Sequence, residues 1–460
     1  MAALSGKFKF VLFLLIVAGA AFAGFGAFRV GPEATVAFTH DLPGIGRETV
    51  VTADIREPKR GLGQAHAVLK QGDRSWDLGR FDGGEMRPSW KFWGPRVEET
   101  RLEFPVGKAH QKELKEGDAV IEVTVDRAGA WLRGPGPAVH SLTLPVRLKP
   151  PTISVESTAH YVQQGGAECV VYRVGKGAVR DGVQAGDRFF PGFPLPGGGE
   201  RDRFALFAGP HDLEDGERVR LIAEDDIGNL AQRAFVDRYK ARPLLLDTIS
   251  VDDTFMARVV PTILEQTPDL DDQGSLVENY VHINNELRKQ NAATLQSLAG
   301  KTSRTFAWTR PFRSLPNAAV TSHFADRRTY VYEGREIDKQ DHLGFDLASV
   351  RRAEIPAANR GTVLMAEYFG IYGNTILIDH GYGLQSLYGH LSSISVNVGD
   401  TVERGQVIGR TGATGLAGGD HLHFTMLVHG ASVDPREWWD GHWIQDRIAR
   451  KMGNAWAFER

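Results

Sequence analysis

The sequence contains a single cysteine, Cys169, among 460 residues. One thiol excludes any disulfide within the chain, and it leaves no cysteine near the N-terminus for lipid attachment. An excess of positive charge is also missing, because 54 Lys and Arg residues against 57 Asp and Glu residues give a formal net charge of −3. This balance argues against nucleic acid, or another broadly anionic polymer, as a partner.

Several common site motifs are absent as well. The glycine-rich stretch 191–199 lacks the Lys-Ser/Thr ending of a P-loop and the spacing of the dinucleotide fingerprint, so phosphate binding is not expected there. No His-Glu-x-x-His motif occurs anywhere in the chain. A metal site built on a helix with a glutamate base is therefore not expected either.

One long apolar run stands at the N-terminus. Lys7 and Lys9 precede an uncharged run from Phe10 to Phe28, and its length is near the ~20 residues that a membrane-crossing helix needs. The basic flank places the N-terminus inside and the remainder outside. We predict that residues 1–29 anchor the chain in the inner membrane, with its bulk in the periplasm. The alternative is a signal peptide cleaved after Ala23, which would give a secreted protein.

The length of 460 residues predicts about three domains. Alternating strand patterns at 48–56 and 119–126 indicate an immunoglobulin-like β-sandwich over residues 30–150, where Trp90, Phe92 and Trp93 are either core or surface aromatics. Two prolines at 150–151 mark a boundary, and similar patterns predict a second immunoglobulin-like β domain over 151–240. The fold class is thus mainly β and multidomain.

Between residues 241 and 300 the apolar period becomes helical. The apolar positions that follow this spacing are Leu276, Tyr280, Ile283, Leu287, Leu295 and Leu298. Ser275 is a candidate helix cap and Gly300 a candidate stop. We predict a helical hairpin that packs beside the C-terminal region. The alternative is a lid or interaction arm that regulates access to a cleft or holds a regulatory protein partner.

The last third of the chain concentrates histidines at short spacings. His342 lies four residues before Asp346, His421 lies two residues before His423, and His390 falls between the two pairs. In an extended segment, residues two or four apart point to the same face. Imidazole and carboxylate groups together suit zinc, whose catalytic sites use three protein ligands and an open position.

Longer phrases around these residues occur in a recognisable order. They are Thr321-Ser-His-Phe, His342-Leu-Gly-Phe-Asp346, Tyr372-Gly-Asn-Thr-Ile-Leu-Ile-Asp-His-Gly381, Leu387-Tyr-Gly-His390-Leu-Ser, 398–409, Thr411-Gly-Ala-Thr-Gly415, His421-Leu-His-Phe and Val433-Asp-Pro435. Over about 321–435 the chain resembles the lysostaphin-type (LytM-type) zinc metallopeptidases, which cut peptidoglycan cross-bridges. The resemblance implies an antiparallel β-sheet peptidase domain, which we place at 301–440 with residues 441–460 as a C-terminal tail.

The resemblance also implies roles for individual residues. His342, Asp346 and His423 would bind one Zn²⁺ per chain, and His390 and His421 would be the two catalytic histidines without a metal bond. A zinc-activated water would then attack the scissile peptide bond, with the two imidazoles exchanging protons. How the two histidines divide these tasks stays open.

Outside these positions the sequence departs little from the family pattern. Ala325 stands where the family has a turn glycine, which affects the local backbone and not the metal site. We interpret His323 as a rim residue, His380 as structural, and His429 and His442 as surface residues.

The resulting functional prediction is an exported zinc metalloendopeptidase that hydrolyses peptide cross-links of peptidoglycan in cell-wall remodelling. Some relatives have lost their metal ligands and activate other wall hydrolases. The alternative is therefore a non-catalytic activator or wall-binding protein that regulates other wall hydrolases. The presence of all the expected metal ligands in this sequence counts against this alternative.

Overall fold

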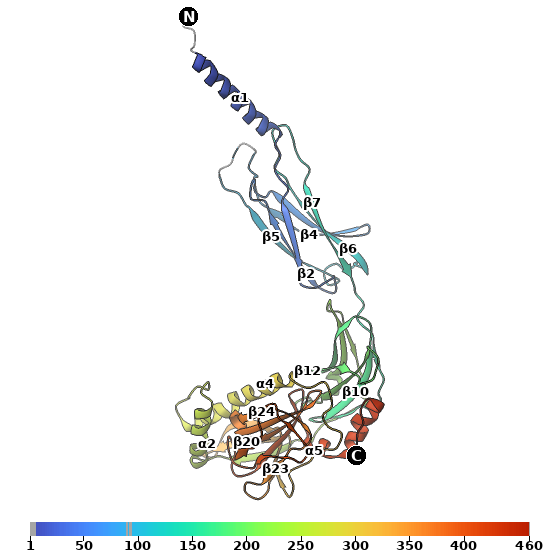
Figure 1. Ribbon diagram of the computed structural model, residues 1–460, viewed down its shortest axis with the longest axis vertical. Helices are drawn as coiled ribbons and strands as arrows, with labels where there is room; N and C mark the ends of the chain where they lie inside the picture. The colour runs from blue at the N-terminus through green and yellow to red at the C-terminus, as the bar shows by residue number, and fades with distance from the viewer. Residues whose placement is uncertain (1–5, 89–90, 92–93, 460) are drawn as a thin grey trace. The chain divides into compact units, whose positions relative to one another are not determined.

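The computed structural model describes residues 6–88, 91 and 94–459, which divide into two compact units (Figure 1). The first unit comprises residues up to Pro151 together with 224–230, and the second comprises 152–223 and the chain from Ala231 onward. Residues Trp90, Phe92 and Trp93, weighed above as core or surface aromatics, lie outside the described residues.

The N-terminal apolar run forms one continuous helix, α1 (Gly6–Phe28). It has a mean hydropathy of 2.4 and, among the described residues, is the one helix long and apolar enough to cross a membrane. A signal sequence near an N-terminus shares this length and composition.

The first unit contains two antiparallel sheets, with strand orders β1-β2-β5 and β4-β3-β6-β7. The strands are β1 (Thr35–His40), β2 (Thr49–Arg56), β3 (Gln64–Gln71), β4 (Arg74–Asp82), β5 (Glu99–Val106), β6 (Gly117–Val125) and β7 (Ala138–Val146). Alternate residues of β2 and β6, such as Val51, Ile55, Ile121 and Val123, are buried in one core. The predicted β-sandwich pattern is confirmed here.

The second unit begins with two further four-stranded sheets, ordered β13-β14-β10-β8 and β12-β11-β15-β16, and a parallel pair β17-β9. The strands are β8 (Ile153–Val155), β9 (Tyr161–Gln163), β10 (Ala167–Val174), β11 (Ala178–Ala185), β12 (Arg188–Pro191), β13 (Phe193–Pro194), β14 (Asp202–Ala208), β15 (Val219–Asp225), β16 (Leu230–Arg233) and β17 (Arg238–Lys240). Strand β10 is buried along nearly its whole length.

The end of the chain, which includes the predicted tail 441–460, forms short helices. They are α5 (Pro435–Trp439), α6 (Gly441–Ile444), a π-helical turn (Gln445–Ala449) and α7 (Arg450–Met452). The π-turn and α7 pack on β10, where Lys451 Nζ lies 2.6 Å from the buried carboxylate of Glu168. The π-turn and α7 therefore cover β10 of the second β region, whereas α5 packs on β30 (Leu422–Val428) of the C-terminal sheet.

A larger sheet dominates the C-terminal region, with the order β19-β22-β30-β26-β25-β24-β28 and β31 beside β30. Its strands are β19 (Ala319–Ser322), β22 (Phe345–Ala348), β24 (Gly361–Tyr368), β25 (Asn374–Gly381), β26 (Leu384–Gly389), β28 (Thr401–Val402), β30 (Leu422–Val428) and β31 (Ala431–Val433). Every pairing in this sheet is antiparallel, as predicted. Beside it, β20 (Asp326–Tyr332) pairs with β21 (Arg335–His342), and β29 (Val407–Arg410) pairs with β23 (Glu354–Pro356) and β27 (Ser393–Ile394).

The predicted helical segment packs on this region. It contains β18 (Leu245–Ser250), α2 (Asp253–Gln266), α3 (Leu276–His282), a π-helical turn (Ile283–Leu287) and α4 (Arg288–Ala299). Ser275 caps α3 through the Glu278 amide, and Gly300 follows the end of α4, as the sequence predicts. Strand β18 pairs in parallel with β20, so the segment shares a sheet with the region it packs on.

Candidate metal and catalytic site

Neighbouring strands bring the predicted metal ligands together. Asp346 on β22 lies directly opposite His423 on β30, and His342 ends β21 just before the turn into β22. Gly344 forms that turn, where a Cβ atom would lie 2.6 Å from the His423 ring and from Thr425 Oγ1. Only glycine lets the backbone pass this close, which explains the His-Leu-Gly-Phe-Asp order.

Three side-chain atoms converge at this place. His342 Nε2 and His423 Nδ1 each lie 3.0 Å from Asp346 Oδ1, and the two nitrogens are 3.1 Å apart. All three side chains are buried. Among the described residues, they are the group of His, Cys, Asp and Glu side chains close enough together to hold one metal ion.

The second ring nitrogen of His342 fixes where its proton lies. His342 Nδ1 is 2.9 Å from the carbonyl oxygen of His323, and a carbonyl oxygen accepts only. The Nδ1–H group therefore donates this bond, and a neutral ring presents the lone pair of Nε2 to Asp346.

The same argument holds for His423. Thr425 Oγ1 donates to the carbonyl oxygen of Leu343 at 3.0 Å, so its oxygen accepts the 3.0 Å hydrogen bond from His423 Nε2–H. The lone pair of Nδ1 then faces Asp346. Two nitrogen lone pairs and one carboxylate oxygen meet with no proton among them, which is the arrangement that a bound cation satisfies. The donor set therefore fits a metal.

His390 and His421 stand beside this cluster without belonging to it. Their ring centroids are 4.9 Å apart, and His421 Nε2 lies 3.5 Å from Asp346 Oδ1. The Nδ1 atoms bond to the carbonyl oxygens of Thr414 (2.8 Å) and Gly419 (2.9 Å). Both neutral rings thus carry their proton on Nδ1 and present Nε2 for proton transfer. His390 holds a left-handed backbone, φ +67°, which is a costly conformation for a non-glycine residue.

Burial and charge set the protonation states. Burial lowers the pKa of His390 well below the usual value, and it lowers the pKa of His423 to about 4. Burial also disfavours a charged His421, but the hydrogen bond and charge of Asp346 outweigh it and raise the pKa of His421.

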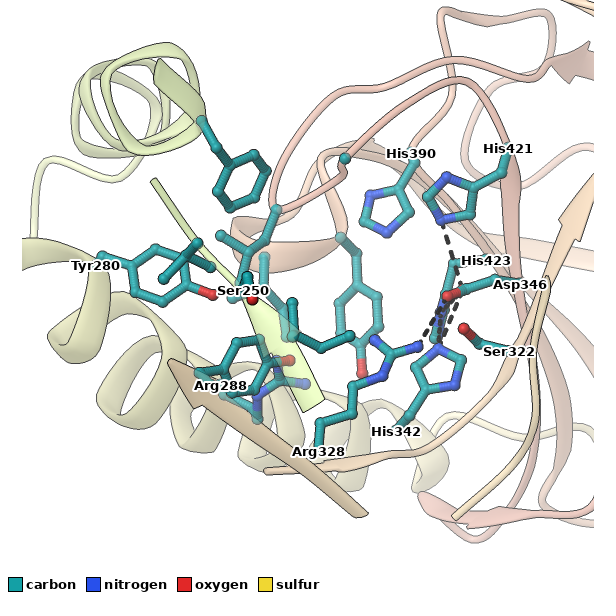
Figure 2. A pocket seen from close by; sticks show the side chains of 18 of the residues that line it. Ser250, Tyr280, Arg288, Ser322, Arg328, His342, Asp346, His390, His421 and His423 are labelled. Carbon is teal, nitrogen blue, oxygen red and sulfur yellow. Dashed lines mark hydrogen bonds and ion pairs between the residues drawn. The ribbon is translucent and has the colours of Figure 1, made fainter. Parts of the chain in front are cut away.

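The five residues line one side of a cavity of about 380 Å³ (Figure 2). The other side comes from the segment upstream of residue 301. Its lining residues are Ile249, Ser250, Val251, Asp252, Phe255, Tyr280 and Arg288. The cavity is therefore a joint product of the C-terminal sheet and the helical segment that packs on it.

The helical segment also braces the loops that carry the two outer histidines. Arg258 on α2 donates to the carbonyl oxygens of Ala417 and Gly418, at 3.1 and 3.0 Å, just before His421. Asn291 on α4 accepts a 3.1 Å hydrogen bond from the Ile371 amide. The next residue in this loop, Tyr372, accepts a hydrogen bond from the His390 amide through its carbonyl oxygen. The segment therefore supports the site as well as covering it.

Of three other histidines, two follow the predictions and one does not. His380 is buried and bonds to the Arg360 carbonyl and the Ser386 hydroxyl, so its structural role is confirmed. His442 is exposed, as predicted. The prediction that His429 lies on the surface is wrong, because its ring is 7% exposed and stacks on Phe193 of the second β region, with centroids 5.7 Å apart.

Three residues at the site were missed from the sequence. Thr425 could have been found, because it lies two residues beyond His423 on one strand and so shares its face. Arg328 donates to Asp346 Oδ2 at 3.1 Å, and Arg288 lines the cavity from α4. Neither arginine has a spacing to the histidines that would reveal it. Ala325, the noted departure from the family pattern, has φ +62°, so the turn keeps the glycine-type backbone.

Comparison with known proteins identifies the C-terminal region. Residues 340–435 match the model of peptidase family M23. The DD-carboxypeptidase/endopeptidase Mpg of Neisseria meningitidis is 37% identical over 94 residues, which are 20% of this chain and 22% of Mpg. The peptidoglycan DD-endopeptidase ShyA of Vibrio cholerae is 30% identical over 165 residues, 35% of each protein.

A relative with a different printed role also matches. The murein hydrolase activator EnvC of Escherichia coli is 34% identical over 95 residues, which are 21% of this chain and 23% of EnvC. The chain thus spans between 22% and 35% of the length of these three relatives. The similarity concerns the C-terminal region.

Proposed function

Residues 340–435 form a domain of peptidase family M23, and from this premise we propose that the protein is a zinc metalloendopeptidase that hydrolyses peptide cross-links of peptidoglycan. One observation carries the proposal. Two imidazole lone pairs and a carboxylate oxygen converge within 3.1 Å of one another, and two further imidazoles stand beside them in a cavity.

Zinc is the metal that this donor set suits best. Two neutral imidazoles and one carboxylate match the three-ligand sites of catalytic zinc, whose ligand atoms at ~2.0–2.1 Å from the ion are separated by roughly 3.3 Å. His342, Asp346 and His423 are the proposed ligands. A bound zinc ion would lower the pKa of a water molecule and polarise the scissile carbonyl group.

The chain's own residues move the protons. His390 and His421 each present Nε2 to the cavity, with Nδ1–H held by a backbone carbonyl oxygen. An imidazole in its neutral form accepts a proton from the attacking water, and one in its charged form stabilises the oxyanion or donates to the leaving amine. Both groups are therefore proposed catalytic residues.

The apolar helix α1 supports an exported protein held at the membrane. Its length and hydropathy suit an anchor, and Lys7 and Lys9 at its start favour an N-terminus inside the cell. We place the bulk of the chain in the periplasm, in contact with peptidoglycan. A signal peptide that is removed, which would release the protein, remains the alternative.

The second candidate function is a non-catalytic activator of other wall hydrolases. The similarity to EnvC favours it. The three proposed metal ligands and the two proposed catalytic histidines are all present, which counts against an activator. An activator needs neither a complete metal cluster nor two histidines beside it.

The test is hydrolysis by the full chain in detergent. Zinc content is measured, and purified peptidoglycan and a panel of folded and unfolded proteins are offered as substrates. We expect about one zinc ion per chain, soluble muropeptides from peptidoglycan, and loss of both zinc and release after treatment with a chelator. Bound zinc without release of muropeptides would contradict the endopeptidase and favour the activator.

Thr425→Val should weaken metal binding although Thr425 touches no metal. The substitution keeps the shape but removes the acceptor that holds His423 Nε2–H, so the wrong tautomer becomes accessible. We expect a roughly 10- to 100-fold lower zinc affinity, measured by competition with a chromophoric chelator. The matched control is Thr375→Val, because Thr375 is also buried and also donates to a carbonyl oxygen but contacts no proposed ligand. Equal affinities of the two variants would rule out this role for Thr425.

A further inference from the structure

An arginine without an acidic partner stands on the wall of the cavity opposite the histidines. Arg288, the first residue of α4, lines the cavity together with the metal cluster. Figure 2 shows it on the side away from His390 and His421, with Arg328 between it and His342. No carboxylate of the described residues forms an ion pair with Arg288, whereas its helical neighbour Lys289 pairs with Glu286.

Asn284 holds the Arg288 guanidinium group in place. Arg288 Nε donates to the Asn284 carbonyl oxygen at 3.1 Å, and Nη2 donates to Asn284 Oδ1 at 2.6 Å. Asn284 is fully buried and donates in turn to Asp338 Oδ2 at 2.6 Å. Two bonds on one edge orient the planar group and leave Nη1 free to donate. Asn284 belongs to the π-helical turn, a feature that often marks functional sites.

The other charges of the cavity already have partners. Arg328 bonds to Asp346, and Asp341 lies 3.0 Å from Arg327 Nε. Asp252 caps α2 by accepting a hydrogen bond from the Phe255 amide. Of the two arginines that line the cavity, Arg288 is therefore the one without a carboxylate partner.

The surroundings of Arg288 strengthen its attraction for an anion. Ile249, Val251, Phe255 and Tyr280 line the same side of the cavity. Because apolar walls exclude water, a charge-assisted hydrogen bond formed between them is stronger than one formed in solvent.

We infer that Arg288 binds a free carboxylate of the substrate, and so selects cross-links that carry one beside the scissile bond over uncharged bridges such as glycine chains. The inference rests on the proposed function, which it makes more specific. Guanidinium groups bind carboxylates through paired N–H donors, and an oriented guanidinium loses little entropy on binding. Arg288 thus contributes to substrate binding, whereas the zinc cluster and the two histidines contribute to hydrolysis of the scissile bond.

The test compares two forms of one cross-linked muropeptide, with the carboxylate beside the scissile bond free or amidated. We expect the unmodified full chain to have the lower KM for the free form. Arg288→Gln should raise KM for the free form by roughly 10- to 100-fold, with a smaller effect on kcat, and should remove most of the preference over the amidated form. Arg288→Lys should retain part of the preference for the free form.

Lys289→Gln is the matched control, because it removes the same charge one residue away at an exposed position. Circular dichroism checks that each variant is folded. Equal KM values of the unmodified chain for the free and amidated peptides would overturn the inference, and so would an Arg288→Gln variant that keeps the preference. The first comparison needs no variant, so a misfolded Arg288→Gln would not prevent a decision.

Binding separates this inference from the proposed function. Calorimetry measures the affinity of the chain for the free and amidated peptides without requiring turnover. If the chain cleaves neither peptide but binds the free form more tightly through Arg288, the endopeptidase proposal fails and the carboxylate site stands. If it cleaves both with equal KM and binds both equally, the carboxylate site fails and the endopeptidase stands.

Discussion

Replacing His423 with alanine is expected to reduce the zinc content of the purified full chain from about one ion per molecule to near zero, and to abolish muropeptide release. His423 supplies one of three proposed ligands, and two ligands are too few to retain the ion through purification. The loss also leaves the Asp346 carboxylate and His342 Nε2 facing each other without the third donor. Zinc is measured by elemental analysis, and release by chromatography of the soluble muropeptides.

His429→Ala is the control for this experiment. His429 is also a buried histidine and directly follows the end of β30, but it packs on Phe193 and lies outside the metal cluster. We expect it to keep its zinc and to lose only stability. A His423→Ala protein that binds zinc as the unmodified chain does would exclude His423 as a ligand.

His390→Ala is expected to keep zinc and to lose roughly 100- to 10,000-fold in turnover, the usual contribution of a positioned acid or base. His390 Nε2 is not one of the three converging atoms, so the metal cluster stays intact. The position has φ +67°, where alanine is strained and asparagine is better tolerated. His390→Asn is therefore the second variant, since it removes the imidazole and keeps the backbone.

Turnover and zinc content are measured on both His390 variants. Full turnover in either would show that His390 has no catalytic role. Loss of zinc in the alanine variant, but not in the asparagine variant, would show instead that backbone strain at this position disturbs the cluster.

The ligand set was predicted through the family resemblance, because spacing alone shows only that His342 can share a face with Asp346 and His421 with His423. In the structure the pairing of β22 with β30 brings Asp346 and His423 together. His342 joins them across a local turn, which Gly344 makes possible. The caps at Ser275 and Gly300 follow from equally local chemistry. The ligand roles, the zinc itself and the domain borders stay predictions until they are measured.

What escaped prediction depends on contacts between distant parts of the chain. His429 was assigned to the surface because nothing near it in the sequence shows that Phe193 covers it. Arg328 reaches the cavity from β20, which pairs with β21, and Arg288 reaches it because the helical segment packs against the same region. Such pairings are set by packing of whole faces, which a pattern of single residues does not encode.

The parallel pairing of β18 with β20 has a consequence for how the chain responds to proteolysis. A backbone cut in the loop 267–275, between α2 and α3, would leave β18 and α2 held by strand hydrogen bonds and by the apolar contacts of Val259 and Ile263. The product would be a nicked protein of two associated chains, not a peptidase freed of a propeptide. A fragment that begins at residue 301 would lack β18, the strand that pairs with β20, and seven of the twenty residues that line its cavity, so the smallest unit for expression begins upstream of Leu245.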